Sequence, residues 1–151
     1  MHGQIPGCIR SSEFDGDGLS LGSIRLVEGS KVINYYGSNR YGQYMNEIPT
    51  GNLGCLSVDT GSADENAFSA TPILEVISMS GLQVDFYSDY IGGEIRLAYY
   101  HDGNKVIPVT GISISGALTE VLQDIQLSQR SGIYRGYCGP EKAILDHLKI
   151  F

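Results

Sequence analysis

The sequence predicts an α+β, β-rich fold, mainly an antiparallel, barrel-like sheet with one clear helix near the C-terminus. Twenty glycines among 151 residues, with few long helical patterns, indicate many turns. The Asp102-Gly103 pair between two alternating apolar runs is one of the strongest short-range hairpin signals. A single apolar stripe beginning at Leu118 indicates the helix. The length favours one domain, residues 1–151.

The first predicted element is a β-hairpin. Apolar residues fall largely on alternate positions over 19–26, a turn follows at 28–30, and residues 31–36 return as the second strand. Residues 38–45 are polar and rich in tyrosine, a composition that is compatible with either a short helix or an irregular loop.

The middle of the chain alternates turns and strands. Thr50-Gly51-Asn52 has turn chemistry and leads into a strand over 53–58. Residues 61–71 are small, polar and acidic, so a mobile loop is expected there. Residues 73–79 are rich in β-branched side chains and predict a strand that Gly81 ends.

The Asp102-Gly103 turn joins a strand over 94–100 to one over 105–109. Alternation over 144–150 predicts a final strand.

The helix is expected from apolar residues one turn apart. These are Leu118, Val121, Leu122 and Ile125, at i, i+3, i+4 and i+7. Ser115 precedes them, and its hydroxyl is expected to cap the helix by accepting a backbone N–H of the first turn.

Charge and hydropathy limit the class of protein. The net charge of −7 and the pI of about 4.8 repel phosphate backbones, so no nucleic-acid partner is expected. No apolar run reaches the roughly 18 residues of a membrane span, and the N-terminus lacks a signal-peptide pattern. The sequence predicts a soluble, cytoplasmic protein without a membrane partner.

Metal and nucleophile chemistry have few candidate residues. The three cysteines lie far apart, form no CxxC pair and are expected to be ordinary thiols: Cys8, Cys55 and Cys138. Only three histidines occur, none close to another, and HExxH is absent. A zinc hydrolase needs about three protein ligands, so this chain is not expected to be one by itself.

Local motifs are weak. The acidic segment Glu13–Gly18 begins like a calcium loop, but Ile24 stands where a bidentate carboxylate is required, so an acidic turn is expected. Residues 111–116 resemble a nucleophile elbow, but Ser115 replaces its second glycine. Clustered tyrosines over 35–44 could line a peptide groove, although half-buried strand tyrosines are the more ordinary interpretation.

An ordered series of segments carries a family resemblance. It consists of Thr50-Gly51-Asn52, Gln83-Val84-Asp85 followed by Ser88-Asp89-Tyr90, the hairpin over 98–109, the run Thr110-Gly111-Ile112-Ser113-Ile114-Ser115-Gly116, and Gly136-Tyr137-Cys138-Gly139. From about Phe14 to the C-terminus the chain resembles the C-terminal domain of the TldD/PmbA family, metallopeptidase-related proteins also called modulators of DNA gyrase. The family's glycine before the aspartate of the second segment is missing.

The resemblance implies a site divided between domains. In the family's active branch, zinc is held by two histidines of an HExxxH helix in the N-terminal domain and by a cysteine near the C-terminus. Cys138 matches that cysteine, whereas the N-terminal HExxxH domain is absent from this chain. The short stretch after Cys138 looks more like the PmbA-type partner without a working metal site. Cys138 is therefore a zinc ligand in an assembly or a buried structural thiol.

The resemblance implies that the chain acts as the C-terminal domain of a metallopeptidase-related protein and contributes the β-rich half of a peptide-cleaving assembly. A TldD/PmbA-type subunit would be its homo- or hetero-oligomeric partner, and an unfolded peptide its substrate. Zinc is expected only in such an assembly, so the chain alone is expected to be inactive and no catalytic residue is assigned. The alternative is a non-catalytic peptide- or protein-binding module without a metal.

Overall fold

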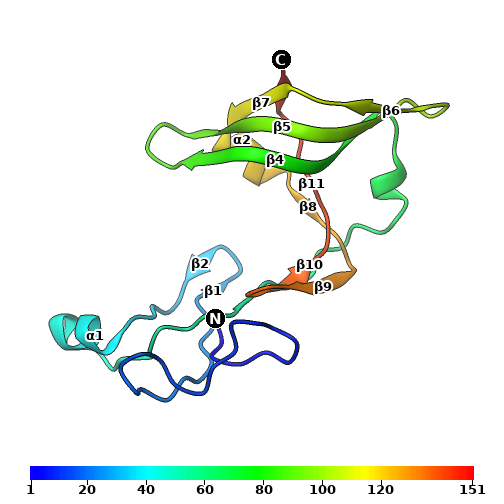
Figure 1. Cartoon of the computed structure of the whole chain (residues 1–151). Coiled ribbons are helices and arrows are strands. Elements are labelled where there is room, and N and C mark those ends of the chain that lie inside the picture. Colours follow the sequence, from blue (N-terminus) through cyan, green and yellow to red (C-terminus); the bar gives the residue numbers. More distant parts are fainter. The chain divides into compact units, whose positions relative to one another are not determined.

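The computed structural model describes residues 1–151 and divides the chain into two compact units (Figure 1). Unit 1 comprises Met1–Thr60 and Arg130–Glu141, and unit 2 comprises Gly61–Gln129 and Lys142–Phe151. Both units contain more strands than helices, and most of their strand pairs are antiparallel.

A five-stranded antiparallel sheet dominates unit 2. Its strands are β12 (Lys149–Ile150), β7 (Ile112–Ala117), β5 (Tyr90–His101) and β4 (Ile73–Asp85), in that order, with β6 (Val106–Val109) beside β5. The predicted barrel is wrong. Strands β12 and β4 do not pair with each other, so the sheet keeps two open edges, whereas a barrel needs its first and last strands to pair.

Strand β4 continues past Gly81, contrary to the expected end. The pairing with β5 shifts register between Ser80 and Gln83 and then resumes to Asp85. Gly81 adopts a φ of +67°, which a residue without a Cβ reaches at little cost. The glycine therefore forms an irregularity within the strand instead of ending it.

The predicted hairpin at Asp102-Gly103 is confirmed and joins β5 to β6. The Asp102 carboxylate accepts the backbone N–H groups of Asn104 at 2.8 Å and Lys105 at 2.7 Å, which also holds the pKa of Asp102 below its usual value. Gly103, at a φ of +96°, completes the turn.

The helices are short. Helix α1 (Asn39–Met45) lies in unit 1 and has seven residues, and α2 (Leu118–Gln123) lies in unit 2 and has six. The sequence predicted one clear helix near the C-terminus with an apolar stripe that reaches Ile125. The structure has only the short helix α2 there, which ends before Ile125. No helix is long and apolar enough to cross a membrane. A 3-10 turn, η1 (Ala67–Ser69), lies within the loop predicted over 61–71.

The expected cap of α2 is also wrong. Ser115 lies within β7, opposite Gly92 and Lys149, and does not cap the helix. The carboxylate of Asp89 accepts the N–H of Thr119 at 2.8 Å and its hydroxyl at 2.7 Å. The carbonyl of Asp89 accepts the N–H of Leu118 at 3.0 Å, so a residue far away in sequence caps the helix.

The core of unit 2 forms where α2 packs on the sheet. One buried cluster joins Ile91 of β5 to Leu118 and Val121 of α2, and the other joins Ile95, Ala98 and Ile114 within the sheet. Leu148 packs against both clusters, which ties the C-terminal segment to this core.

The C-terminal segment forms two strands instead of the one predicted. Strand β11 (Ala143–Ile144) pairs with β8 (Gln126–Leu127), whereas β12 pairs with β7. His147 lies between β11 and β12 at a φ of +62°, which interrupts the extended backbone.

Unit 1 has short elements. The hairpin of β1 (Val27–Glu28) and β2 (Lys31–Val32) confirms the predicted turn, but each strand has only two residues. The first strand predicted over residues 19–26 is wrong, because β1 begins after them. In a three-stranded sheet, β10 (Tyr137–Pro140) runs parallel to β3 (Leu56–Ser57) and antiparallel to β9 (Ser131–Tyr134).

Candidate functional site

Cys138 occupies the middle strand of the unit 1 sheet. It lies opposite Ile133 of β9 and Ser57 of β3, and its carbonyl accepts the N–H of Val58 at 2.9 Å. Its side chain is half-buried and its thiol is free. The backbone position of the one predicted metal ligand is therefore fixed on both sides by strand pairing.

The chain alone does not offer Cys138 a zinc site. No group of three or more histidine, cysteine, aspartate or glutamate residues in the structure is arranged to hold a metal ion. A zinc ion takes about four ligands, at least three of them from protein in most sites, so the residues present do not fit the metal. Cys138 can serve as one ligand only.

The other two cysteines stabilise the packing of unit 1. Both are buried, and the Cys8 thiol donates to the carbonyl of Arg135 at 2.9 Å. The Cys55 thiol lies 3.7 Å from the Ser11 hydroxyl, and burial raises its pKa. A raised pKa keeps this thiol protonated and unreactive at neutral pH.

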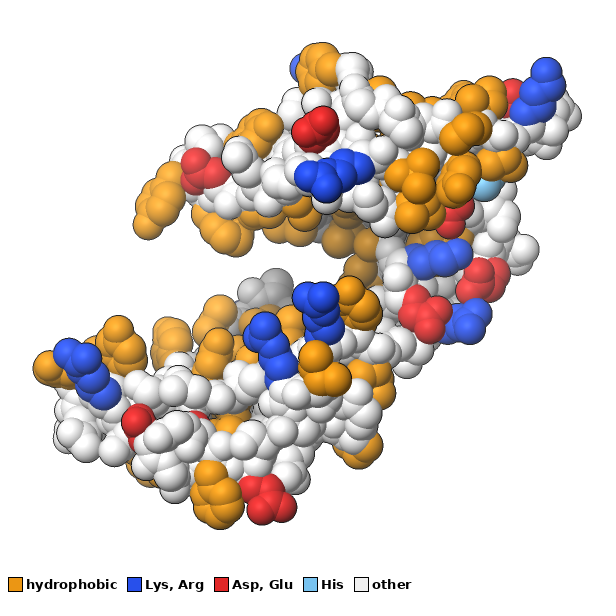
Figure 2. Space-filling model, viewed as in Figure 1, with side chains coloured by type: hydrophobic (Ala, Val, Ile, Leu, Met, Phe, Trp, Pro, Cys, Tyr) orange, Lys and Arg blue, Asp and Glu red, His pale blue; other side chains and the backbone are white.

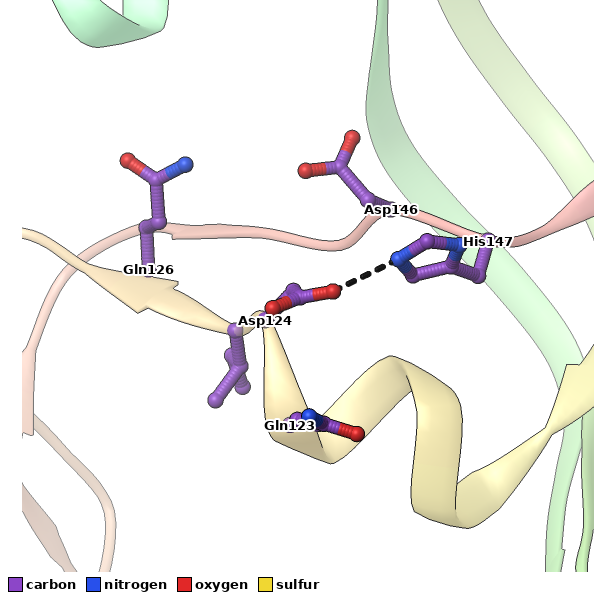
Figure 3. Close-up of a pocket in the computed structure, with 6 residues that line it drawn as sticks. Gln123, Asp124, Gln126, Asp146 and His147 are labelled. Carbon is purple, nitrogen blue, oxygen red and sulfur yellow. Dashed lines mark hydrogen bonds and ion pairs between the residues drawn. The ribbon is translucent and has the colours of Figure 1, made fainter.

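The three histidines lie apart, as in the sequence. His2 Nδ1 lies 2.8 Å from the Ser23 hydroxyl in unit 1, and His101 pairs with Glu75 at 3.1 Å between β5 and β4. His147 donates from Nε2 to Asp124 at 2.7 Å beside an open pocket of about 700 Å³ in unit 2 (Figure 3).

His147 is surrounded by carboxylates. The hydrogen bond to Asp124 and the negative charges of Asp124, Glu120 and Asp146 raise the pKa of His147 above 6.5. The remaining pocket residues Gln123, Ile125 and Gln126 supply no serine, threonine or cysteine nucleophile for this imidazole to activate. The geometry is that of a charged pair joining the end of α2 to the segment before β12.

Strand β4 offers the most extended free backbone of the chain. It has thirteen residues, pairs only with β5 and forms one edge of the sheet. Four large apolar side chains along it are exposed, namely Val76, Ile77, Leu82 and Val84. Hydrophobic side chains are also visible along the sheet of unit 2 in Figure 2.

The clustered tyrosines are not half-buried strand residues, so that interpretation is wrong. Tyr41 and Tyr44 lie on α1, and Tyr35 and Tyr36 lie outside any strand. All four are exposed, from 47% for Tyr36 to 86% for Tyr35. Tyr36 lines a second pocket, entirely within unit 1.

The sequence assigns no substrate-binding residue, although Tyr36 of the tyrosine cluster does line the unit 1 pocket. No local pattern predicts the free β4 edge or the other residues of that pocket. The sequence did not predict the full length of the β4 edge, because Gly81 indicates an early end to the strand. The pocket draws on segments from both ends of the chain.

Comparison with known proteins identifies the family. Residues 2–150 match the family described as the PmbA/TldA metallopeptidase C-terminal domain. The chain belongs to this family. The resemblance inferred from the ordered segments is therefore confirmed across nearly the whole chain.

A solved structure shows the same fold in a longer protein. The TldD/PmbA-type chain matches a crystal structure from Thermotoga maritima, described as a modulator of a DNA gyrase, with a TM-score of 0.73 and 14% sequence identity. The match covers 98% of this chain and 37% of that chain. No curated protein matches the sequence.

Proposed function

We propose that this TldD/PmbA-type domain contributes the β-rich half of a peptide-cleaving assembly and binds an unfolded peptide along the edge of β4. The free edge of β4, over thirteen residues, is the observation that carries the proposal. Its backbone N–H and C=O groups on the outer side have no partner strand.

An edge of this kind suits a peptide of varied sequence. Main-chain hydrogen bonds to an added strand supply affinity that does not depend on side chains. Exposed edges in stable monomers are usually short or protected by charge or bulges. Strand β4 has register irregularities near Ile77 and Gly81, but it is long and exposes Val76, Ile77, Leu82 and Val84. These side chains add apolar contact to a bound strand.

Cleavage requires groups that this chain lacks. In the proposed assembly Cys138 supplies one zinc ligand, and a partner subunit of the TldD/PmbA type supplies the HExxxH histidines and the glutamate base. A zinc ion bound there would polarise the peptide carbonyl. Three free cysteines suit the reducing cytoplasm, and the net charge of −7 disfavours a nucleic-acid partner.

Peptide binding to β4 is tested with lysine substitutions. A fluorescent, unstructured peptide is titrated by anisotropy against the full chain and against Ile77→Lys and Leu82→Lys. Lysine on an edge strand opposes strand addition, so affinity is expected to fall about tenfold. Val32→Lys, at a residue 65% exposed on β2, is the matched control and is expected to bind as the unmodified chain does. Equal affinities for all four proteins would refute the β4 site.

The assembly is tested by native mass spectrometry of the protein purified from its own host with metal retained. A larger complex with zinc, which loses the metal in Cys138→Ser, supports the proposal. A metal-free species of one chain length would instead support the non-catalytic binding module. Metal-dependent peptide cleavage by the pure chain would contradict the assignment of the missing ligands to a partner.

A further inference from the structure

A pocket in unit 1 combines two arginines with aromatic and apolar walls. It has a volume of about 610 Å³, and all its lining residues belong to unit 1. Arg10 and Arg135 supply its positive charge, and Tyr36, Tyr134 and Tyr137 supply aromatic surface.

The stem of Arg10 is held between two glycines. A Cβ at Gly54 would lie 2.8 Å from the Arg10 carbonyl oxygen and 3.2 Å from its Cβ. A Cβ at Gly136 would lie 2.7 Å from the Arg10 Cδ. A larger residue at either position would meet Arg10, so the two glycines leave room for it beside the segment before β3 and the turn between β9 and β10.

Arg135 is held by the turn between β9 and β10. It adopts a φ of +53°, and its carbonyl accepts the Ile9 N–H at 3.1 Å and the Cys8 thiol at 2.9 Å. Its guanidinium lies over the Tyr134 ring, 5.5 Å from the centroid. These bonds tie the segment before Arg10 to the turn that carries Arg135, which brings both arginines to one pocket.

Neither guanidinium in the pocket has a carboxylate partner. Among the other arginines of unit 1, Arg25 pairs with Asp59 at 3.4 Å and Arg130 pairs with Glu141 at 3.1 Å. No ion pair involves Arg10 or Arg135.

The balance of charge also differs between the units. Six of the ten basic residues but only seven of the seventeen acidic ones lie in unit 1, which gives it a net charge of −1 against −6 for unit 2. The pocket is therefore a cationic spot on the less acidic unit.

We propose that this pocket binds a carboxylate attached to an apolar or aromatic group, as found at the C-terminus of a peptide or on an acidic side chain beside an apolar residue. A guanidinium is planar and matches a carboxylate through paired hydrogen bonds. The adjacent apolar walls, Leu26, Leu53 and Leu56, receive the neighbouring side chain. This inference deepens the proposed function and rests on it, because it names the chemical class of peptide group that unit 1 binds.

The probes separate the two sources of the carboxylate. One is a pentapeptide ending in leucine and phenylalanine with a free C-terminal carboxylate. The second is its C-terminal amide, and the third is the amide with glutamate before the leucine. Each is titrated into the isotope-labelled full chain, with affinity and site read from amide chemical shifts. If only the peptide with the free C-terminal carboxylate binds, the pocket recognises a C-terminus. If the amide with glutamate binds as well, the pocket recognises any carboxylate beside an apolar group. Equal binding of the plain amide overturns the proposal.

Charge-removing variants complete the test. Arg10→Gln keeps most of the stem between the glycines. Arg10→Gln and Arg135→Gln, made as separate variants, are each expected to weaken carboxylate binding about five- to tenfold. Arg40→Gln on α1 is the matched control and is expected to leave binding unchanged. Preserved chemical-shift dispersion shows that each variant is folded.

The result is distinguishable from that of the β4 experiment. Ile77→Lys is expected to keep carboxylate binding, because Ile77 belongs to unit 2. Loss of binding in Arg10→Gln with β4 binding retained supports the pocket alone. Unchanged affinity in both pocket variants, or no shift of pocket amides at millimolar peptide, would overturn it.

Discussion

Replacing Asp89 with alanine is expected to destabilise unit 2, because its side chain caps α2 from the turn between β4 and β5. The carboxylate accepts two hydrogen bonds from Thr119, at 2.8 Å and 2.7 Å. Loss of a helix cap costs about 0.5–2 kcal/mol. Asp89 also adopts a φ of +50°, a conformation that alanine tolerates less well than aspartate or asparagine, by roughly 1 kcal/mol. Together these give a loss of about 2 kcal/mol in the free energy of unfolding.

Two companion variants separate the causes. Asp89→Asn keeps an oxygen acceptor and tolerates the same φ, so it is expected to lose less than about 1 kcal/mol. Ser115→Ala tests the cap that the sequence predicts; since Ser115 lies within β7, its effect is expected to stay within about 0.5 kcal/mol.

The free energies are measured by urea denaturation, with hydrogen exchange of the α2 amides as a local readout. Faster exchange in Asp89→Ala is expected to be concentrated in α2. Unchanged stability of Asp89→Ala, or a loss in Ser115→Ala as large as in Asp89→Ala, would refute the reasoning.

Three further changes have defined outcomes. The hydrogen bond to Asp124 and the nearby carboxylates raise the pKa of His147 above 6.5. The protonated pair with Asp124 therefore stabilises the fold fully below pH 6.5, and this stabilisation is lost as the pH rises through the raised pKa. In Asp124→Asn, NMR titration is expected to give a lower pKa for His147. Val121→Ala, at a side chain with no exposed surface, is expected to lose about 2–3 kcal/mol in urea denaturation, whereas Leu122→Ala, half-exposed on the same helix, loses less than about 1 kcal/mol. Gly136→Ala is expected to lower the stability of unit 1 in thermal denaturation and to weaken carboxylate binding, because its Cβ meets the stem of the pocket arginine.

Opposite outcomes would contradict each of these expectations. An unchanged His147 titration in Asp124→Asn would show that the ion pair does not form in solution. Equal losses for the two α2 variants would show that burial on one face does not govern the helix. Gly22→Ala is the control for the glycine change, because nothing lies within 4 Å of its added Cβ; an equal loss there would remove the steric argument.

Local signals predicted several elements correctly. Asp102-Gly103 places a turn because the aspartate carboxylate binds backbone N–H groups two and three residues ahead and the glycine adopts a positive φ. At Gly29, a positive φ of +58° likewise allows the turn predicted between β1 and β2. Such interactions involve residues near in sequence, so the pattern is visible without the fold.

Other predictions failed where local preference competed with pairing over longer distances. Gly81 ends a strand by propensity, but the partner strand β5 continues, and the hydrogen bonds beyond the irregularity outweigh the local cost. Apolar alternation over 144–150 suggested one strand, but the two halves pair with different strands and His147 turns the backbone between them.

The sequence by itself determined the β-rich composition, the main hairpin and the ordered segments that placed the chain in the PmbA/TldA metallopeptidase C-terminal domain family. Only the tertiary structure decided that Asp89 caps α2, that β4 is an open edge and that Arg10 and Arg135 share a pocket. Each of these features joins groups distant in the chain. Their proximity depends on which strands pair and in what register, and a hydrophobic pattern does not encode that choice locally.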